Sequence, residues 1–217
     1  MTKSQRPRAR KGAAESSRDL LLRVTIAQLD EGGEDKIRLE AILAEADCSP
    51  SSLYHHFGNL RGLVDEAQIA RFERQLDGRT QIVRDAFDRI TDKEELIRFS
   101  IAILKGLFDT DGAESRSSRA NALGSTYKRP DFAKKMGVVL QENCDDLAAA
   151  FRIAQLRGLI LPSVDLRAVA VWVQGMLFGR VLAELVNDDV IEREWDALTI
   201  RAILFTMFGP DTTDIPL

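Results

Sequence analysis

Hydrogen-bonding side chains are concentrated between Ser49 and Phe57, in the run Ser-Pro-Ser-Ser-Leu-Tyr-His-His-Phe. Serine, tyrosine and histidine can each donate and accept hydrogen bonds, so a helix rich in them can contact polar groups outside the protein. Such a helix suits a hydrophobic core poorly. Its short side chains instead allow the backbone to come close to a groove, while its longer ones reach the polar edges there. The segment therefore predicts a helix that enters the groove of DNA.

The residues around this segment predict how it is held. An amphipathic stretch over about 38–46 precedes it, followed by a tight turn. Ser49 fits the N-cap, and Pro50 takes the first helical position, where its missing N–H group costs nothing. Leu53 and Phe57 are four residues apart and share one face, which leaves the polar side chains largely free. Two helices joined by a short turn match the helix-turn-helix pattern.

Almost every segment of the 217-residue chain has the apolar periodicity of a helix, and none shows convincing strand alternation. We expect an all-α protein, with a basic flexible arm over 1–13 and a three-helix helix-turn-helix domain over 14–62. A larger helical domain follows over 63–217, and a long helix that starts near residue 60 connects the two. Thr91 to Glu94 fits a capping box that opens a further helix.

The charge of the chain is unevenly distributed. The net charge of −4 argues against a general polyanion binder. The first eleven residues, however, carry five cations and no acid, namely Lys3, Arg6, Arg8, Arg10 and Lys11. We expect this arm to lie along phosphates or to enter a minor groove. A solvated, disordered terminus is the alternative.

The sequence offers little support for an enzyme or a metal site. His55 and His56 are the only histidines, and as neighbours in a helix they point in different directions and cannot easily share a metal ion. There is no Gly-rich phosphate loop and no paired nucleophile and base. We therefore expect no catalytic activity, no metal and no cofactor.

The two cysteines and the apolar stretches bear on location. Cys48 and Cys144 lie far apart and form no metal or disulfide pattern, which favours free thiols in a reducing, cytoplasmic compartment. The longest apolar stretch, over 168–186, is almost long enough to span a membrane. It contains Gln174, Arg180 and Glu184, which are costly at the centre of a bilayer, so we expect a buried helix of a soluble protein.

The last two expected helices, over about 165–187 and 191–208, are apolar on nearly all sides. A soluble helix of this kind needs neighbours on every side. One monomer can hardly cover both helices, so we expect a homodimer in which the pair meets its symmetry mate as a four-helix bundle. A fully internal core helix is the alternative.

Residues 45–63, Glu-Ala-Asp-Cys-Ser-Pro-Ser-Ser-Leu-Tyr-His-His-Phe-Gly-Asn-Leu-Arg-Gly-Leu, resemble the signature of the TetR family of bacterial transcriptional repressors. The family pattern has alanine, glycine, a branched residue and serine, then a Leu-Tyr-x-His-Phe core and an Asn-Lys turn into the next helix. The resemblance is close over about 16–67. Beyond that it extends only to the number of helices and a dimer-like ending.

The resemblance implies roles for residues at matching positions. Tyr54 would bind a backbone phosphate through its hydroxyl group, and His56 would pack beside the phosphate backbone. Ser51, Ser52 and His55 stand where the family has base- and sugar-facing contacts, and Arg38 stands near a phosphate. The full set of expected DNA contacts is Arg38, Ser49, Ser51, Ser52, Tyr54, His55, His56 and Arg61.

Three positions depart from the family pattern. Asp47 replaces the usual turn glycine and tolerates a left-handed conformation, while Cys48 is a small apolar substitute for valine. Leu60 replaces the usual lysine, so one expected phosphate contact is missing. Arg61, or the free N–H groups at the start of the next helix, would replace it.

The resemblance also implies a small-molecule pocket in the C-terminal helices. Ligand binding there would change the separation of the two DNA-binding domains of a dimer and release a palindromic operator. We expect a repressor with a largely apolar inducer; plain core packing is the alternative for each apolar candidate. A helical ligand-binding or scaffolding dimer with degenerate DNA binding is the alternative function, kept open by Asp47 and Leu60. The pocket candidates are Phe99, Ile103, Phe108, Phe132, Met136, Leu140, Trp172 and Met176, with Tyr127, Asn143 and Gln174 as polar groups.

Overall fold

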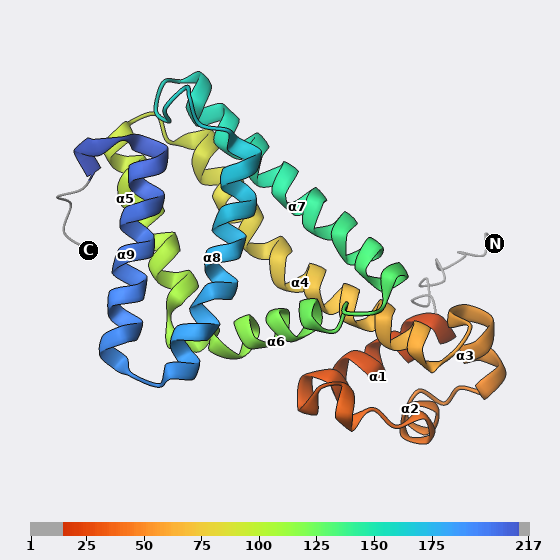
Figure 1. The fold of residues 1–217 in the computed structure, drawn as a ribbon. Helices are drawn as coiled ribbons and strands as arrows, with labels where there is room; N and C mark the ends of the chain where they lie inside the picture. Colours follow the sequence, from red (N-terminus) through yellow and green to blue (C-terminus); the bar gives the residue numbers. More distant parts are fainter. Residues whose placement is uncertain (1–14, 213–217) are drawn as a thin grey trace, which may run out of the picture. The chain divides into compact units, whose positions relative to one another are not determined.

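The computed structural model describes residues 15–212, apart from the side chains of residues 77–79 and 110, and the expected basic arm over 1–13 lies outside this range. Within the described range every regular element is helical, which confirms the predicted fold class (Figure 1). The helices are α1 (Ser17–Gly32), α2 (Leu39–Glu45), α3 (Pro50–Phe57), α4 (Leu60–Arg89), α5 (Lys93–Phe108), α6 (Ala113–Gly124), α7 (Pro130–Leu156), α8 (Leu166–Val186) and α9 (Asp189–Phe208), with short 3₁₀ turns at Glu34–Lys36, Thr110–Gly112 and Pro210–Thr212.

The chain divides into two compact units, one ending at Gln68 and the other beginning at Ile69. This division falls inside α4, a few residues after the domain boundary expected at 62. We call them the N-terminal unit and the C-terminal unit. Helix α4 begins in the first and continues in the second.

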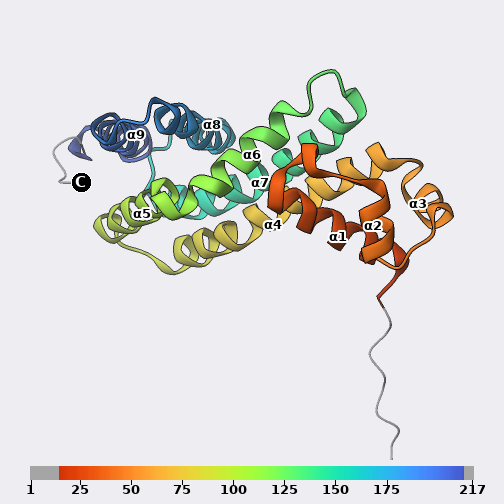
Figure 2. The same cartoon turned by 90° about the horizontal axis from the view of Figure 1, so that it is seen from below.

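The N-terminal unit consists of α1, α2, α3 and the start of α4, and Figure 2 shows α1 to α3 grouped together. The hydroxyl oxygen of Ser16 accepts a hydrogen bond from the backbone N–H of Asp19 and caps α1. The apolar stripes expected from the sequence meet in one small core. Its buried members are Leu21, Val24, Ile42, Ala46, Leu53, Phe57 and Leu63.

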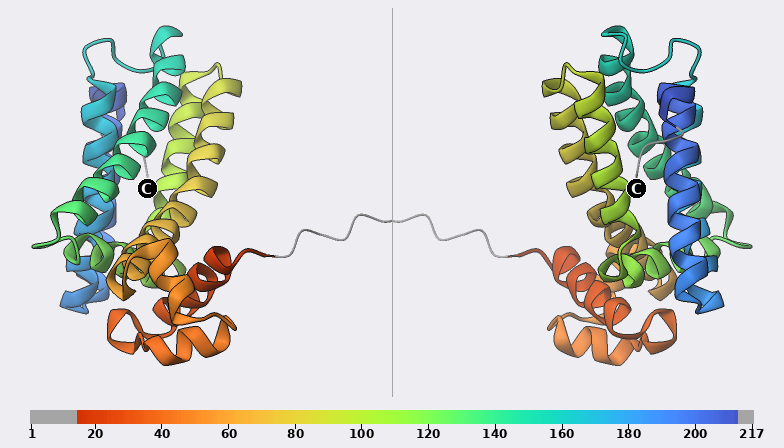
Figure 3. Two further views of the ribbon diagram at one scale, coloured as in Figure 1. Left: turned by 90° about the vertical axis from the view of Figure 1, so that its right-hand side faces the viewer. Right: turned by 90° about the vertical axis from the view of Figure 1, so that its left-hand side faces the viewer.

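The C-terminal unit is arranged around α8, which packs against α5, α6, α7 and α9. Helices α8 and α9, blue in Figure 3, run side by side. Aspartates cap both of them. Asp165 accepts two backbone N–H bonds at the start of α8, and Asp188 accepts two at the start of α9.

The predicted capping box at the start of α5 is misplaced by one residue. The side chain of Asp92, not Thr91, accepts the N–H bond, from Glu95 at 2.8 Å. Thr91 is exposed and precedes the cap. A carboxylate is as good an N-cap as a hydroxyl group, and two candidate caps in sequence cannot be ranked by spacing alone.

Helix α8 is the one described helix long and apolar enough to cross a membrane, judged by length and composition. Gln174 and Arg180 of this helix are buried against neighbouring helices. One face of the helix stays uncovered, with Val171, Leu182 and Leu185 exposed. The helix is thus a central element of the C-terminal unit, although the chain does not cover it completely.

A buried arginine joins α6 to α8. The side chain of Arg116 is 1% exposed, and its Nε atom donates to a carboxylate oxygen of Glu184 at 2.8 Å. Its other nitrogens donate to the backbone carbonyls of Leu107 at 2.7 Å and Asp109 at 2.8 Å. One guanidinium group therefore binds α6 to α8 and to the end of α5.

A second buried arginine extends this network to α9. Arg180 donates from Nε to Asp196 at 2.6 Å and from Nη2 to Glu192 at 2.8 Å. Burial raises the pKa of the Asp196 carboxyl group above its ordinary value, although the hydrogen bond and charge of Arg180 oppose this shift. The buried ion network, defined as Arg116, Arg180, Glu184, Glu192 and Asp196, has two cations and three acids.

We predict that Arg116→Met lowers the free energy of unfolding of the C-terminal unit by about 3 kcal/mol or more, because it leaves buried acceptors without their donor. Urea unfolding followed by the fluorescence of Trp172 and Trp195, the two tryptophans of the chain, measures this unit specifically. The control is Arg167→Met, whose pair with Asp145 is largely exposed and should contribute about 0–1 kcal/mol. Equal losses in the two variants would contradict the prediction.

Candidate nucleic-acid interface and ligand cavity

Helix α3 has the ends and the buried face that its sequence predicts. The hydroxyl oxygen of Ser49 accepts a hydrogen bond from the N–H of Ser52 at 3.3 Å, and Pro50 occupies the first turn. The helix ends at Gly58, whose φ of +75° is strained for a residue with a side chain. Leu53 and Phe57 are buried, so the opposite face of the helix is held outward.

The turn between α2 and α3 accommodates two of the departures from the family pattern. Asp47 has a φ of +49°, so it adopts the left-handed conformation for which a glycine is usual. The N–H group of Cys48 donates to the carbonyl of Leu43 at 3.0 Å, and its half-buried side chain packs against the small core. Both replacements therefore preserve the helix-turn-helix geometry.

The outer face of α3 presents polar side chains to solvent. Ser51 and His55 are exposed, and the side chain of Tyr54 is 57% exposed. The hydroxyl groups of Ser49 and Ser51 lie 2.8 Å apart, and those of Ser49 and Ser52 lie 3.3 Å apart. This face offers several donors and acceptors on a rigid helix.

His56 contacts a residue of another helix in the N-terminal unit. Its Nε2 atom lies 3.1 Å from the hydroxyl oxygen of Ser17 in the first turn of α1. The contact joins the end of α3 to the start of α1. Ser17 has no local signal in the sequence, since it lies 39 residues from His56.

The start of α4 depends on a glycine. The Asn59 side chain accepts a hydrogen bond from the N–H of Gly62 at 2.8 Å and so caps the helix. A Cβ atom on Gly62 would lie 2.2 Å from the backbone carbonyl oxygen of Phe57. Leu60, in the place of the expected lysine, packs partly buried against the small core. The first turn of α4 thus supports the end of α3.

Two exposed arginines flank α3 in the sequence, one at the start of α2 and one in the first turn of α4. Arg38 is exposed at the start of α2, and its Nη1 atom donates to the carbonyls of Asp35 and Ile37, both at 2.8 Å. The side chain of Arg61 is 63% exposed and lies 3.8 Å from a carboxylate oxygen of Glu34. Both cations are accessible, and Arg61 has a nearby acid that partly offsets its charge.

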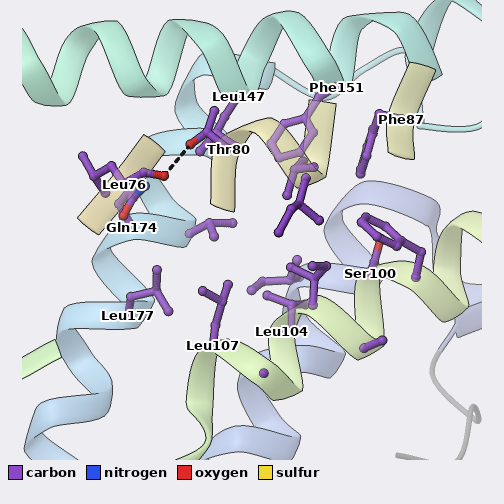
Figure 4. A pocket seen from close by; sticks show the side chains of 18 of the residues that line it. Leu76, Thr80, Phe87, Ser100, Leu104, Leu107, Leu147, Phe151, Gln174 and Leu177 are labelled. Carbon is purple, nitrogen blue, oxygen red and sulfur yellow. Dashed lines mark hydrogen bonds between the residues drawn. The ribbon is translucent and has the colours of Figure 1, made fainter. Parts of the chain in front are cut away.

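The C-terminal unit contains a cavity of about 280 Å³ with walls from α4 to α9 (Figure 4). Its walls are largely apolar, with the aromatic rings of Phe87, Phe99 and Phe151 among them. Three of the sequence candidates line it, namely Phe99, Ile103 and Gln174. The volume lies near the lower end of the range for small-molecule sites.

The structure places the other pocket candidates elsewhere. Asn143 is hydrogen-bonded to Gln174 behind the cavity wall and lines a separate polar groove between α4 and α7. Tyr127 is 77% exposed after α6. The remaining candidates are packing residues or lie outside the lining: Phe108 and Trp172 belong to the main core, Phe132, Met136 and Leu140 to a separate cluster, and Met176 is half-buried.

The lining residues that sequence reasoning missed come mostly from α4 and α5. They include Thr80, Val83, Phe87, Ser100 and Leu104. In an amphipathic helix the same apolar face contacts both the core and the cavity, so periodicity does not distinguish core residues from cavity-lining residues. Their common position is a consequence of tertiary packing.

These features define a helix-turn-helix DNA-binding protein with a separate, all-helical domain that contains an apolar cavity. Residues 21–67 match the model of a family described as "Bacterial regulatory proteins, tetR family". The match falls on the DNA-binding domain, and a solved structure assigned to the TetR family shares the fold over most of this chain. Residues 21–67 are therefore a DNA-binding domain of the TetR family, and the chain has the fold of the regulators of that family.

Several solved structures show how widely this fold is shared. A protein from Mesorhizobium loti assigned to the TetR family is 19% identical with a TM-score of 0.68, and the match covers 91% of this chain and all of the other. SmeT, the repressor of the Stenotrophomonas maltophilia multidrug efflux pump SmeDEF, is 21% identical with a TM-score of 0.58 over 94% and 98%. The fatty acid degradation regulator FadR from Bacillus halodurans is 16% identical with a TM-score of 0.55 over 88% and 97%. None of the curated proteins matches the sequence significantly.

We predict that Gly62→Ala loosens the end of α3, because the added methyl group would overlap a backbone carbonyl that cannot move without the helix. Hydrogen exchange of the α3 amides should become faster, and DNA affinity should fall with it. The control is Gly137→Ala in α7, where a Cβ meets no atom within 4 Å and alanine should add up to about 1 kcal/mol of stability. Unchanged α3 exchange in Gly62→Ala would contradict the prediction.

Proposed function

We propose that this regulator is a cytoplasmic repressor that binds a roughly palindromic operator as a homodimer and releases it when a small, largely apolar inducer occupies the cavity. The observation that carries the proposal is the exposed polar face of α3, held outward by buried Leu53 and Phe57. A recognition helix needs this combination of rigidity and free hydrogen-bonding groups. One structural relative, SmeT, is itself a repressor.

The proposed contacts to DNA fall into two groups, those that position α3 on the phosphate backbone and those that recognise base edges. We assign Tyr54, His56 and the two flanking arginines to the phosphate backbone, since hydroxyl, imidazole and guanidinium groups donate to phosphate oxygens. His55 and Ser51 are the exposed α3 side chains assigned to base edges, with Ser49 and Ser52 beside them at the start of the helix. The basic arm over 1–13 would add phosphate or minor-groove contacts.

The homodimer is supported by an uncovered apolar face on the last two helices. On α8, Val171, Leu182 and Leu185 are exposed along one side, and Gly175 lies on the same side with open space around its Cα. On α9, Ile191, Leu198 and Phe205 are exposed at seven-residue intervals. We call these residues the apolar stripe. A second copy of the chain, packed as a four-helix bundle, would cover it.

The ligand part of the proposal rests on the cavity in the C-terminal unit. A concave, largely apolar site with a few polar groups is the usual form of a small-molecule site. The inducer would release the operator by favouring a conformation in which the spacing of the two recognition helices no longer matches that of the operator half-sites. The alternative, a scaffolding dimer with degenerate DNA binding, loses support because Asp47 adopts the required turn conformation and Leu60 is a packing residue.

We predict that operator selection from random DNA yields a palindromic site. Of two variants of α3, one should then lose affinity for all sequences and the other should lose base preference. Tyr54→Phe should weaken binding about tenfold for all sequences, because it removes a hydrogen bond to a charged group. His55→Ala should relax the preference at one base pair of each half-site by about 1–3 kcal/mol. The control is Tyr127→Phe, at the other tyrosine of the chain. Failure to select any sequence would favour the scaffolding alternative.

We predict that the full chain sediments with twice its monomer mass of 24.2 kDa and that Leu182→Glu or Leu198→Glu raises the dimer dissociation constant by about 100-fold or more. Each change removes buried apolar area and adds a charge that the interface would have to desolvate. Leu156→Glu, at a leucine of α7 that is also largely exposed but lies outside the apolar stripe, is the control. A monomeric wild-type chain, or equal effects of all three changes, would exclude this interface.

A further inference from the structure

The cavity in the C-terminal unit is open on one side, between α4 and α5. Three residues that line it there are exposed to solvent, namely Ile82 of α4 and Ala102 and Gly106 of α5. A Cβ atom on Gly106 would meet no atom within 4 Å. We call these three residues the mouth of the cavity, because a ligand can enter beside their small or exposed side chains.

The wall away from the mouth consists of buried apolar side chains from three other helices. Leu147 and Phe151 of α7 and Leu177 of α8 surround the same space in Figure 4. Ile203 and Met207 of α9 complete this part of the wall and are also buried. Hydrocarbon side chains make no hydrogen bonds, so the inner part of the cavity favours the hydrocarbon part of a ligand.

Two polar side chains of the wall, Gln174 and Thr80, are bonded to Asn143 behind it. The amide nitrogen of Gln174 donates to the side-chain oxygen of Asn143, and the amide nitrogen of Asn143 donates to the hydroxyl oxygen of Thr80, both at 2.8 Å. The Thr80 hydroxyl group itself donates to the carbonyl of Leu76 at 3.3 Å. The carboxamide oxygen of Gln174 is completely buried, so a ligand in the cavity cannot reach it. These groups join α4, α7 and α8 and offer a ligand little.

The other polar side chains of the wall are also bonded within the protein. The amide nitrogen of Gln75 donates to the hydroxyl oxygen of Ser118 at 3.4 Å, and the hydroxyl group of Ser100 donates to the carbonyl of Leu96 at 2.8 Å. Arg119 is the one charged residue among the described lining side chains, and it is 2% exposed. A polar group of a ligand would lose its hydrogen bonds to water in this space and gain few in return, which disfavours polar groups inside the cavity.

Polar partners are available outside, next to the mouth. Arg98 and Lys105 lie one turn to either side of Ala102 on α5, and Asp85 lies one turn from Ile82 on α4. All three charged side chains are exposed. A polar group at the mouth can therefore bind water and charges of either sign, while the same group further inside cannot.

The volume of the cavity sets the length of the hydrocarbon part. A cavity of about 150 Å³ that is lined by Leu, Ile and Phe holds benzene. The cavity of about 280 Å³ in this protein has, by proportion, room for about ten carbon atoms. A chain of eight carbon atoms therefore fits.

We propose that the cavity binds an amphiphile with a polar group at one end only, such as a medium-chain alcohol. Its unbroken hydrocarbon part enters between α4 and α5, and its polar group stays at the mouth. This inference rests on the proposed function, because it names the chemical class and the orientation of the inducer. A polar group in the middle of the chain would be drawn into the apolar part of the cavity and would weaken binding.

The test compares three isomeric eight-carbon alcohols. The hydroxyl group is at the end of the chain in 1-octanol and in the middle in 4-octanol, while 4-methylheptan-1-ol has a methyl branch in the middle and the hydroxyl group at the end. Calorimetry on the full-length protein should show 4-octanol binding about tenfold or more weakly than 1-octanol, because its hydroxyl group is buried without a partner. The methyl-branched isomer should bind nearly as tightly as 1-octanol.

The three isomers have the same atoms, and the methyl-branched one controls for shape. Equal binding of 1-octanol and 4-octanol would overturn the proposal. So would an equal loss of affinity in both branched isomers, which would show that shape rather than polarity decides binding, or no binding of 1-octanol.

Variants at the mouth locate the bound alcohol. Gly106→Phe and Ala102→Phe each place a ring where the chain would enter, so each should weaken 1-octanol binding by about tenfold or more. Gly137→Phe is the matched control, at a glycine of α7 outside the cavity whose Cβ atom would also meet nothing within 4 Å. Urea unfolding of the three variants shows that the fold is kept. Unchanged binding in both mouth variants would overturn the proposal.

Addition of the alcohols to the protein bound to its selected operator tests the proposed function separately. Tighter binding of 1-octanol than of 4-octanol without release of DNA would leave the ligand class standing and would exclude inducible release by this class. Release of DNA by 4-octanol as readily as by 1-octanol would support the inducible repressor and overturn the ligand class.

Discussion

The C-terminal unit depends on one constraint, which is how α8 can be covered. This helix is apolar on almost every side and is 21 residues long, so it needs neighbours all around it. Helices α5, α6, α7 and α9 supply part of that cover. Gln174 and Leu177 line the cavity, Arg180 and Glu184 form part of the buried ion network, and Leu182 and Leu185 remain exposed. A single helix therefore connects the three features on which a ligand-responsive regulator would rely.

Local signals in the sequence are sufficient for the N-terminal unit. Ser49 caps α3, and Leu53 and Phe57 are buried, each as the pattern predicts. Caps and four-residue spacings are short-range properties, and they can therefore be inferred without a fold. The misplaced cap at Asp92 marks the limit of such inference, because neighbouring residues with similar capping ability differ only in their tertiary surroundings.

The cavity and the ion network could not be predicted in the same way. Arg116 and Glu184 are 68 residues apart, and Thr80 and Asn143 are 63 apart, so no spacing rule connects them. Among the polar candidates, Gln174 lines the cavity, while Tyr127 is exposed in the turn after α6. A wall position is decided by which helices meet and at what angle, and the amino-acid pattern of one helix does not contain that information.

The apolar stripe has a consequence for the amount of this protein in a cell. If a second copy covers the stripe, folding and assembly draw on the same contacts, and both follow mass action. Dilution then dissociates the dimer and weakens operator binding at the same time, since two half-sites need two DNA-binding domains. The cellular abundance of the regulator would set a threshold below which its target genes escape control, independently of any inducer.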